Sequence, residues 1–202
     1  MIGVVNYGLG NIMSIMNMLR RIGVEAAVCD DPGAIERADR LILPGVGAFD
    51  AGMKMLNGSG MRPSLEAQVA AGTPVLGICL GMQFLGRKSE EGTEPGLGWV
   101  AADTVRLRAA DDLPLPHMGW NWIEPKGPSA LFDPDDAPLR FYFLHSFVVA
   151  CDDESTALAT FDYGGEFVGA LADGNIFGVQ FHPEKSHRFG MKVLERFTRA
   201  DL

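Results

Sequence analysis

Cysteine is scarce in this chain, and the spacing of the few residues excludes two kinds of stabilised small protein. Cys29, Cys79 and Cys151 are odd in number, lie far apart and form no Cys-x-x-Cys pair. This pattern matches neither a disulfide framework nor a zinc site, so no metal is expected. It is typical of a reducing compartment, and we expect a cytoplasmic protein.

Basic residues and long apolar runs are lacking as well. Lys and Arg number 17 against 26 Asp and Glu, which gives a formal net charge of −9. Nucleic acids and anionic membranes both attract clustered basic residues, so neither is expected as the main partner. The most apolar stretch, residues 74–86, is too short and too glycine-rich to span a bilayer, and no basic leader precedes the apolar N-terminal residues.

Nucleotide-binding loops are also missing. Gly8-Leu9-Gly10 follows an apolar run, but Met13 stands where a dinucleotide-binding loop needs glycine, and no P-loop occurs. What is present is an ordinary globular composition, with 47% apolar and 21% charged residues in a chain of 202. This length predicts a single domain that spans residues 1–202.

Short apolar runs alternate with helical patterns in the first half of the chain. Apolar residues recur at spacings of three and four from Ile12 to Ile22, which predicts a helix that ends at Gly23. Further helices are expected over residues 62–71 and 186–199, and strands over residues 2–5, 24–28, 41–43 and 75–78. Buried strands that alternate with helices are typical of a parallel sheet covered by helices.

The second half changes character. From about residue 96 to residue 181 the segments are short, rich in β-branched and aromatic residues, and separated by Pro, Gly and Asp. Residues 141–149 and 166–171 are examples, and they predict antiparallel strands and hairpins. The sequence therefore predicts an α/β domain with an open mixed, mainly parallel sheet, flanking helices and a late antiparallel portion.

A cysteine stands between two glycines in Gly77-Ile78-Cys79-Leu80-Gly81, where an apolar run meets a helical pattern. This spacing is that of a nucleophile elbow, a turn too tight for β-carbons on the flanking residues. A cysteine there lies at the end of a central strand, before a helix whose N-terminal amides favour an anion. A buried cysteine between packing glycines is the alternative, and the motif alone does not separate the two.

A histidine and a carboxylate follow the apolar strand expected over residues 176–180. Residues two apart in an extended chain point to the same side, so Glu184 is expected to orient His182 and leave the other ring nitrogen for the thiol. His145 shares its expected strand face with phenylalanines and is interpreted as structural. His117 and His187 have no ligand partners at metal spacing.

Acyl transfer also needs backbone N–H groups aimed at the oxygen that becomes negative. The Leu80 amide is one candidate because it follows the cysteine directly. Pro44-Gly45-Val46-Gly47 follows the third expected strand, and its glycines are able to take unusual dihedral angles. This segment is the second candidate, and a simple turn is its alternative.

Three stretches, PGVGAF (44–49), GICLGMQFL (77–85) and FHPEKS (181–186), resemble in this order the class I glutamine amidotransferases. The similarity runs from about residue 2 to residue 198. Within that family, four further stretches resemble the glutaminase subunits of imidazole glycerol phosphate synthase: NYGLGNIMS, SEEG, PLPHMGWN and YFLHS. Phe147 departs from the family, which usually has tyrosine after the His-Ser pair.

The resemblance implies a flavodoxin-like fold, L-glutamine as the substrate and no cofactor. It implies Cys79 as the nucleophile, His182 as base and then acid, and Glu184 as the residue that orients the histidine. By the same resemblance the oxyanion donors are Leu80, Val46 and Gly47. The remaining implied residues are substrate contacts at Gln83, Glu91, Ser146 and Phe147, and partner contacts at Asn11, Tyr142 and Lys185.

Ammonia released into neutral water mostly takes up a proton, so a useful glutaminase passes it directly to an acceptor site. No stretch remains for a synthase domain, and we expect an obligate partner chain. By resemblance this is a (β/α)₈ cyclase in a heterodimer that converts PRFAR to imidazole glycerol phosphate and AICAR in histidine biosynthesis.

Three alternatives stay open at this point. The tail PEKSHRFGMKVL is typical of paralogous glutaminase subunits that supply ammonia for acetamidino-sugars of surface polysaccharides. The second alternative is a different thiol hydrolase with the same elbow, and the third is an inactive scaffold subunit.

Overall fold

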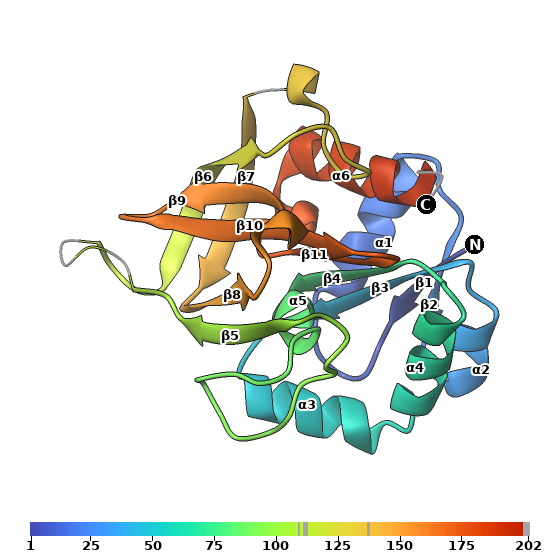
Figure 1. Cartoon of the computed structure of the whole chain (residues 1–202). Helices are drawn as coiled ribbons and strands as arrows, with labels where there is room; N and C mark the ends of the chain where they lie inside the picture. The colour runs from blue at the N-terminus through green and yellow to red at the C-terminus, as the bar shows by residue number, and fades with distance from the viewer. Residues whose placement is uncertain (109, 111–112, 137, 200–202) are drawn as a thin grey trace.

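The protein is described by a computed structural model that covers residues 1–108, 110, 113–136 and 138–199. A nine-stranded sheet runs through it in the order β2-β1-β3-β4-β11-β10-β9-β6-β7, accompanied by a two-stranded sheet of β5 and β8 (Figure 1). No helix in the described ranges combines the length and the apolar character needed to cross a membrane.

Five neighbouring strands form the parallel part of the sheet. They are β2 (Ala26–Cys29), β1 (Ile2–Val5), β3 (Arg40–Gly45), β4 (Val75–Cys79) and β11 (Ile176–Val179). β1, β4 and β11 are buried along their whole length, as expected for strands covered on both faces. The antiparallel portion expected up to residue 181 does include β11 on one side, where it pairs with β10, but on its other side β11 pairs in parallel with β4, which the sequence did not indicate.

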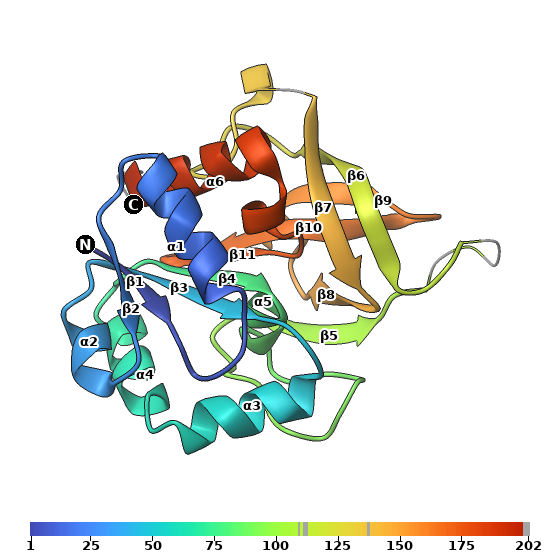
Figure 2. The same ribbon diagram turned by 180° about the vertical axis from the view of Figure 1, so that it is seen from behind.

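Helices cover both faces of this parallel part (Figures 1 and 2). α1 (Ile12–Arg21) and α6 (His187–Arg199) lie on one face, whereas α2 (Pro32–Glu36), α3 (Phe49–Gly58) and α4 (Arg62–Ala70) lie on the other. The helical pattern predicted α1, α4 and α6 but not α3. Interior Gly52 lowers the intrinsic helix propensity of α3, which packs Phe49, Met53 and Leu56 into the core instead.

The antiparallel part continues the same sheet through β10 (Glu166–Asp173), β9 (Ala157–Asp162), β6 (His117–Pro125) and β7 (Leu139–His145). β5 (Ala102–Arg106) pairs with β8 (Phe147–Cys151) in the small sheet. The single strand expected over residues 141–149 was wrong, because the chain leaves one sheet at Ser146 and enters the other. Both strands are rich in apolar residues, so the sequence pattern does not show where β7 ends and β8 begins.

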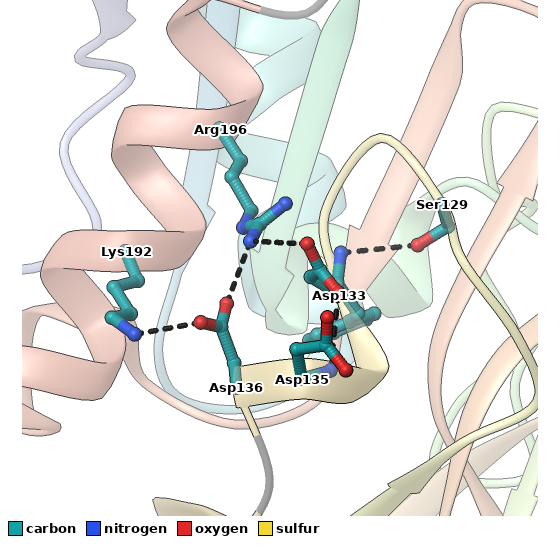
Figure 3. Close-up of polar contacts among 7 residues, drawn as sticks. Ser129, Asp133, Asp135, Asp136, Lys192 and Arg196 are labelled. Atoms are coloured by element: carbon teal, nitrogen blue, oxygen red, sulfur yellow. Dashed lines mark hydrogen bonds and ion pairs between the residues drawn. The ribbon is translucent and has the colours of Figure 1, made fainter.

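An ionic cluster fastens the connection between β6 and β7 to the last helix (Figure 3). Asp136, in the 3₁₀ helix η1 (Pro134–Asp136), accepts hydrogen bonds of 2.7 Å from Lys192 and from Arg196 of α6. Arg196 also lies 3.4 Å from Asp133. The side chain of Asp136 is 17% exposed, so these bonds are only partly screened by water.

Candidate active site

Cys79 occupies a strained turn between β4 and α5 (Leu80–Phe84). Its φ of 55° and ψ of −109° lie outside the regions that residues with side chains prefer, at a cost on the order of 1–3 kcal/mol. A β-carbon on Gly77 would lie 2.7 Å from the carbonyl oxygen of Gly81, and one on Gly81 would overlap the carbonyl oxygen of Leu43. The cramped turn predicted from the glycine spacing is confirmed.

His182 and Glu184 form a buried pair beside this turn. Nδ1 of His182 lies 2.8 Å from Oε1 of Glu184, and the two side chains are 1% and 2% exposed. The pair does not arise in an extended chain as expected, because Glu184 lies in the 3₁₀ helix η3 (Pro183–Lys185). A carboxylate only accepts, so Nδ1 donates, and Nε2 is the nitrogen left for Cys79.

The charges of this pair favour a protonated ring. Burial by itself lowers the pKa of His182, but the side chains of Cys79 and Glu184 outweigh it and raise the pKa to about 10. Nε2 makes no well-formed hydrogen bond to any described residue, yet the thiol lies close enough to act on the ring. Burial raises the pKa of Glu184, and the hydrogen bonds from His182 and Asn11 outweigh it and lower the pKa. The neighbouring Cys79 and Glu184 therefore favour the imidazolium form of His182 over the neutral ring.

One cavity of about 220 Å³ brings most of the predicted site residues together. Its volume suits a small molecule rather than a macromolecule. Nine residues that the sequence singled out line it: Cys79, His182, Leu80, Val46, Gly47, Gln83, Glu91, Ser146 and Phe147. Pro116, Leu144 and His145 complete the wall.

Gln83 and Glu91, which were expected to contact substrate, also make hydrogen bonds within the protein. The amide nitrogen of Gln83 donates to the carbonyl oxygen of Phe147 at 3.2 Å and to Oε1 of Gln180 at 3.3 Å. Oε2 of Glu91 accepts the backbone N–H of Phe49 at 2.8 Å, at the first residue of α3. A substrate contact by Gln83 therefore has to come from its amide oxygen.

The three residues expected at a partner surface lie in different surroundings. Asn11 is directed inward, with Nδ2 3.1 Å from Oε1 of Glu184. Tyr142 is half-buried, and the ammonium of the exposed Lys185 lies 5.4 Å from the centre of its ring. This is the geometry of a cation–π contact.

Sequence reasoning missed several residues around the sulfur and the ring. The amide nitrogen of Gln180 lies 3.8 Å from the sulfur of Cys79. Ser186 Oγ donates to the carbonyl oxygen of His182 at 2.6 Å and accepts the N–H of Tyr142 at 3.0 Å. A signal for Gln180 was available, because the strand expected over residues 176–180 ends on this polar residue, and residues two apart in an extended chain, such as Gln180 and His182, project to the same side.

Comparison with known proteins identifies the family. The model of the family described as glutamine amidotransferase class-I matches residues 3–200. A Pseudomonas aeruginosa protein named imidazole glycerol phosphate synthase subunit HisH 2 is 49% identical over 98% of this chain and 98% of its own. A Bdellovibrio bacteriovorus protein named imidazole glycerol phosphate synthase subunit HisH is 47% identical over 98% of this chain and 99% of its own. The chain belongs to the class I glutamine amidotransferase family.

A solved structure supports the same fold. The crystal structure of a glutamine amidotransferase superposes with a TM-score of 0.77 over 97% of this chain and 96% of that chain, at 22% sequence identity. The expected α/β architecture with a mixed sheet and flanking helices is confirmed. The chain is accordingly an enzyme of the glutamine amidotransferase class.

Proposed function

We propose that this chain is the glutaminase subunit of an imidazole glycerol phosphate synthase, and that residues 1–202 act as one domain. It hydrolyses glutamine and passes the ammonia to a cyclase subunit in histidine biosynthesis. The observation that carries the proposal is the meeting of Cys79 and His182 at one small cavity, with Glu184 behind the ring. The names of the relatives support the pathway.

The reaction follows from the three side chains. The sulfur of Cys79, after passing its proton to His182, attacks the carboxamide carbon of glutamine. The imidazolium returns that proton to the leaving nitrogen, so that ammonia departs and a glutamyl thioester remains. His182 then takes a proton from water, the hydroxyl adds to the thioester, and glutamate leaves as the thiol is restored. Glu184 holds the ring in the tautomer that each step requires.

The developing oxyanion needs backbone donors next to the sulfur. We assign this role to the amide of Leu80, which follows the nucleophile, and to the amides of Val46 and Gly47, which line the same cavity. One such donor accounts for roughly 3–4 kcal/mol of transition-state stabilisation. The positive φ of Gly47, 103°, supports the assignment, because it gives this segment a backbone shape that other residues rarely adopt.

We assign binding of the glutamine substrate to other residues that line the cavity. We assign Glu91 to the α-ammonium group, because one of its oxygens remains available beside the bond to Phe49. The backbone of Ser146 and Phe147 is assigned to the α-carboxylate, and the amide oxygen of Gln83 to a polar contact. Phe147 needs no hydroxyl for this role.

The partner is assigned to an aromatic face made by Met118, Trp120 and Trp122 of β6 with Arg140 and Tyr142 of β7. The three β6 residues are 65%, 36% and 51% exposed, an unusual concentration of large apolar surface. The guanidinium of Arg140 lies 5.4 Å from the ring of Trp120 and 5.6 Å from that of Trp122. Tryptophan, tyrosine and arginine are the residues that dominate binding energy at interfaces.

This aromatic face adjoins the candidate active site, which favours the cyclase as its occupant. The N–H of His182 donates to the carbonyl oxygen of Tyr142 at 2.8 Å, and Met118 pairs in register with Leu144 of the cavity wall. A second hollow of about 320 Å³ is lined by Lys185 and Glu184. A partner that covers this surface would meet ammonia close to where it is released.

Replacement of the nucleophile tests the proposed reaction. In the complex with the cyclase, Cys79→Ala should abolish product formation from glutamine and leave product formation from added ammonia intact. Cys151→Ala, at a half-buried free cysteine outside the cavity, is the matched control and should retain both activities. Persistent use of glutamine by Cys79→Ala would refute the assignment.

Replacement on the aromatic face tests the partner assignment. Trp120→Ala should weaken binding of the cyclase at least about tenfold in calorimetry, the range expected for an interface anchor. Met55→Ala removes another exposed apolar side chain, 40% exposed on α3, and should leave binding unchanged. Equal affinities of the two variants would place the interface elsewhere.

A second acceptor is favoured by one observation. The Pseudomonas aeruginosa relative carries the number 2 in its name, and the tail from Pro183 to Leu194 is typical of the paralogues that serve acetamidino-sugar synthesis. Assays that offer this chain each of the two synthases separate the candidates. Glutamine-dependent turnover with the cyclase supports histidine biosynthesis, whereas turnover with the sugar synthase alone supports the paralogue. In either case we place the enzyme in the cytoplasm, because its thiol requires reducing conditions.

A further inference from the structure

Two buried histidines face each other across β6 and β7. His117 and His145 are paired in the antiparallel register, and they are 3% and 6% exposed. Nδ1 of His117 lies 3.1 Å from Nε2 of His145. The reaction proposed above uses neither ring, although His145 lines the cavity.

The hydrogen bonds of these rings run in one direction only. Nδ1 of His145 lies 2.9 Å from the carbonyl oxygen of Phe147, and since a carbonyl only accepts, this nitrogen carries the proton. Nε2 of a neutral His145 is then an acceptor, so Nδ1 of His117 donates to it. Nε2 of His117 in turn accepts from the amide nitrogen of Asn121 at 3.3 Å.

The chain of bonds requires both rings to be neutral. A second proton on His145 would bring two donors together at the 3.1 Å contact with His117. Burial lowers the pKa of His117 to about 4, and burial, followed by His117, lowers that of His145 to about 3. Other titratable groups that face the pair are His182 and Tyr163, whose ring stacks on His117 at 4.0 Å.

The chain of bonds ends at the sulfur. The carbonyl oxygen of Phe147 accepts from His145 and, with its second lone pair, from Gln83. Gln83 also donates to Gln180, and the amide nitrogen of Gln180 lies 3.8 Å from the sulfur of Cys79. His145, Phe147, Gln83 and Cys79 all line the cavity.

We propose that His117 and His145 are positioning residues for the glutamine pocket, a role that rests on the proposed glutaminase function. Their neutral rings hold the carbonyl group of Phe147, which accepts a hydrogen bond from the amide nitrogen of Gln83 and so orients that amide in the cavity wall. Because His117 lies next to Met118 on β6, the same strand carries the aromatic face and this chain of bonds. The pair sets how well glutamine is held, not the reactivity of the sulfur.

Packing alone does not account for a histidine at position 117. Its ring stacks on Phe143, Phe161 and Tyr163, a setting in which phenylalanine would pack as well. What phenylalanine lacks is the donor at Nδ1. Phenylalanine and asparagine at this position therefore separate packing from hydrogen bonding, because the amide nitrogen of asparagine takes the place of Nδ1.

Labelling of Cys79 in the full-length chain tests the proposal with two probes. A glutamine-derived diazoketone has to bind in the pocket before it alkylates the sulfur, whereas iodoacetamide reports thiol reactivity alone. His117→Phe should raise the half-saturating diazoketone concentration about tenfold and leave the iodoacetamide rate within about twofold. His117→Asn should restore wild-type saturation. Phe161→Leu, which removes a stacked ring without a hydrogen bond, is the control: it should lower Tm only.

Each outcome decides one question. If His117→Phe and Phe161→Leu have the same half-saturating diazoketone concentration, the pair of histidines has only a structural role and the inference is overturned. If His117→Phe does not fold, His145→Asn and His145→Leu provide the same test. Only asparagine keeps a donor to the carbonyl oxygen of Phe147, so only His145→Leu should raise the half-saturating diazoketone concentration. If the wild-type thiol ignores the diazoketone, the proposed glutaminase function itself fails, and the positioning role fails with it.

Discussion

The side-chain amide of Asn11 donates a hydrogen bond of 3.1 Å to Oε1 of Glu184, across 173 positions of sequence. The same oxygen accepts Nδ1 of His182 at 2.8 Å. Two donors on one buried carboxylate keep it ionised and hold it in place. The loop between β1 and α1 therefore helps to position the residue that we propose orients the ring.

Removal of this donor should slow glutamine hydrolysis. Hydrogen bonds to charged groups contribute about 1.5–3 kcal/mol, and we expect Asn11→Ala to lower kcat about tenfold as Glu184 loosens. KM should change little, because Asn11 does not line the cavity. Steady-state kinetics of the complex measure both constants. Asn57→Ala, an exposed asparagine bonded to Arg62, is the control, and a wild-type kcat for Asn11→Ala would contradict the prediction.

The raised pKa of His182 makes stability fall in alkali. Burial lowers the pKa of His182, but Cys79 and Glu184 outweigh burial and raise this pKa from 6.5 to about 10. The stabilisation that the protonated ring provides is therefore complete below pH 6.5 and is lost as the pH approaches 10. The slope is at most about 1.4 kcal/mol per pH unit. Without the sulfur, in Cys79→Ala, the pKa should fall. NMR titration of the ring and urea unfolding at several pH values measure both effects, and identical titrations in the two proteins would exclude this coupling.

The elbow should tolerate no side chain at its second glycine. A β-carbon on Gly81 would overlap the carbonyl oxygen of Leu43, so β3 and α5 would have to separate. We expect Gly81→Ala to lower the free energy of unfolding by about 3 kcal/mol or more. Gly58→Ala, in the last turn of α3 with nothing within 4 Å of the new carbon, should be neutral or slightly stabilising. Urea unfolding ranks the two, and equal stabilities would show that the turn can relax.

The cluster between η1 and α6 should contribute modestly and depend on salt. Asp136 meets two cations, and we expect Asp136→Ala to lower the free energy of unfolding by about 1 kcal/mol. The hydrogen bond from Lys192, followed by that from Arg196, holds the pKa of Asp136 below 3.8 despite burial, so this stabilisation is lost as acid protonates the group. Asp135→Ala, its exposed neighbour, is the control. An effect of the same size at high salt would argue against an ionic origin.

Local constraints made the elbow and the buried strands predictable from the sequence. The two glycines that flank Cys79 indicate a tight turn by their spacing alone, because such a turn excludes β-carbons at these positions whichever residues pack around it. The apolar runs of β1 and β4 are predictable in the same way, since a strand covered on both faces needs apolar residues throughout. His182 and Glu184 were placed together by their separation of two residues, although the backbone between them is a 3₁₀ turn.

The order of the sheet was decided only by the tertiary structure. β4 and β11 are apolar throughout and carry no face pattern that would select a neighbour, so nothing local indicated that they lie side by side in parallel. The end of β7 at Ser146 was not indicated either, because apolar residues continue directly into β8. The contacts of Asn11 with Glu184 and of Gln180 with Cys79 follow from that order. Packing across more than a hundred positions selects such partners, and a periodic pattern records only which side of its own element a residue occupies.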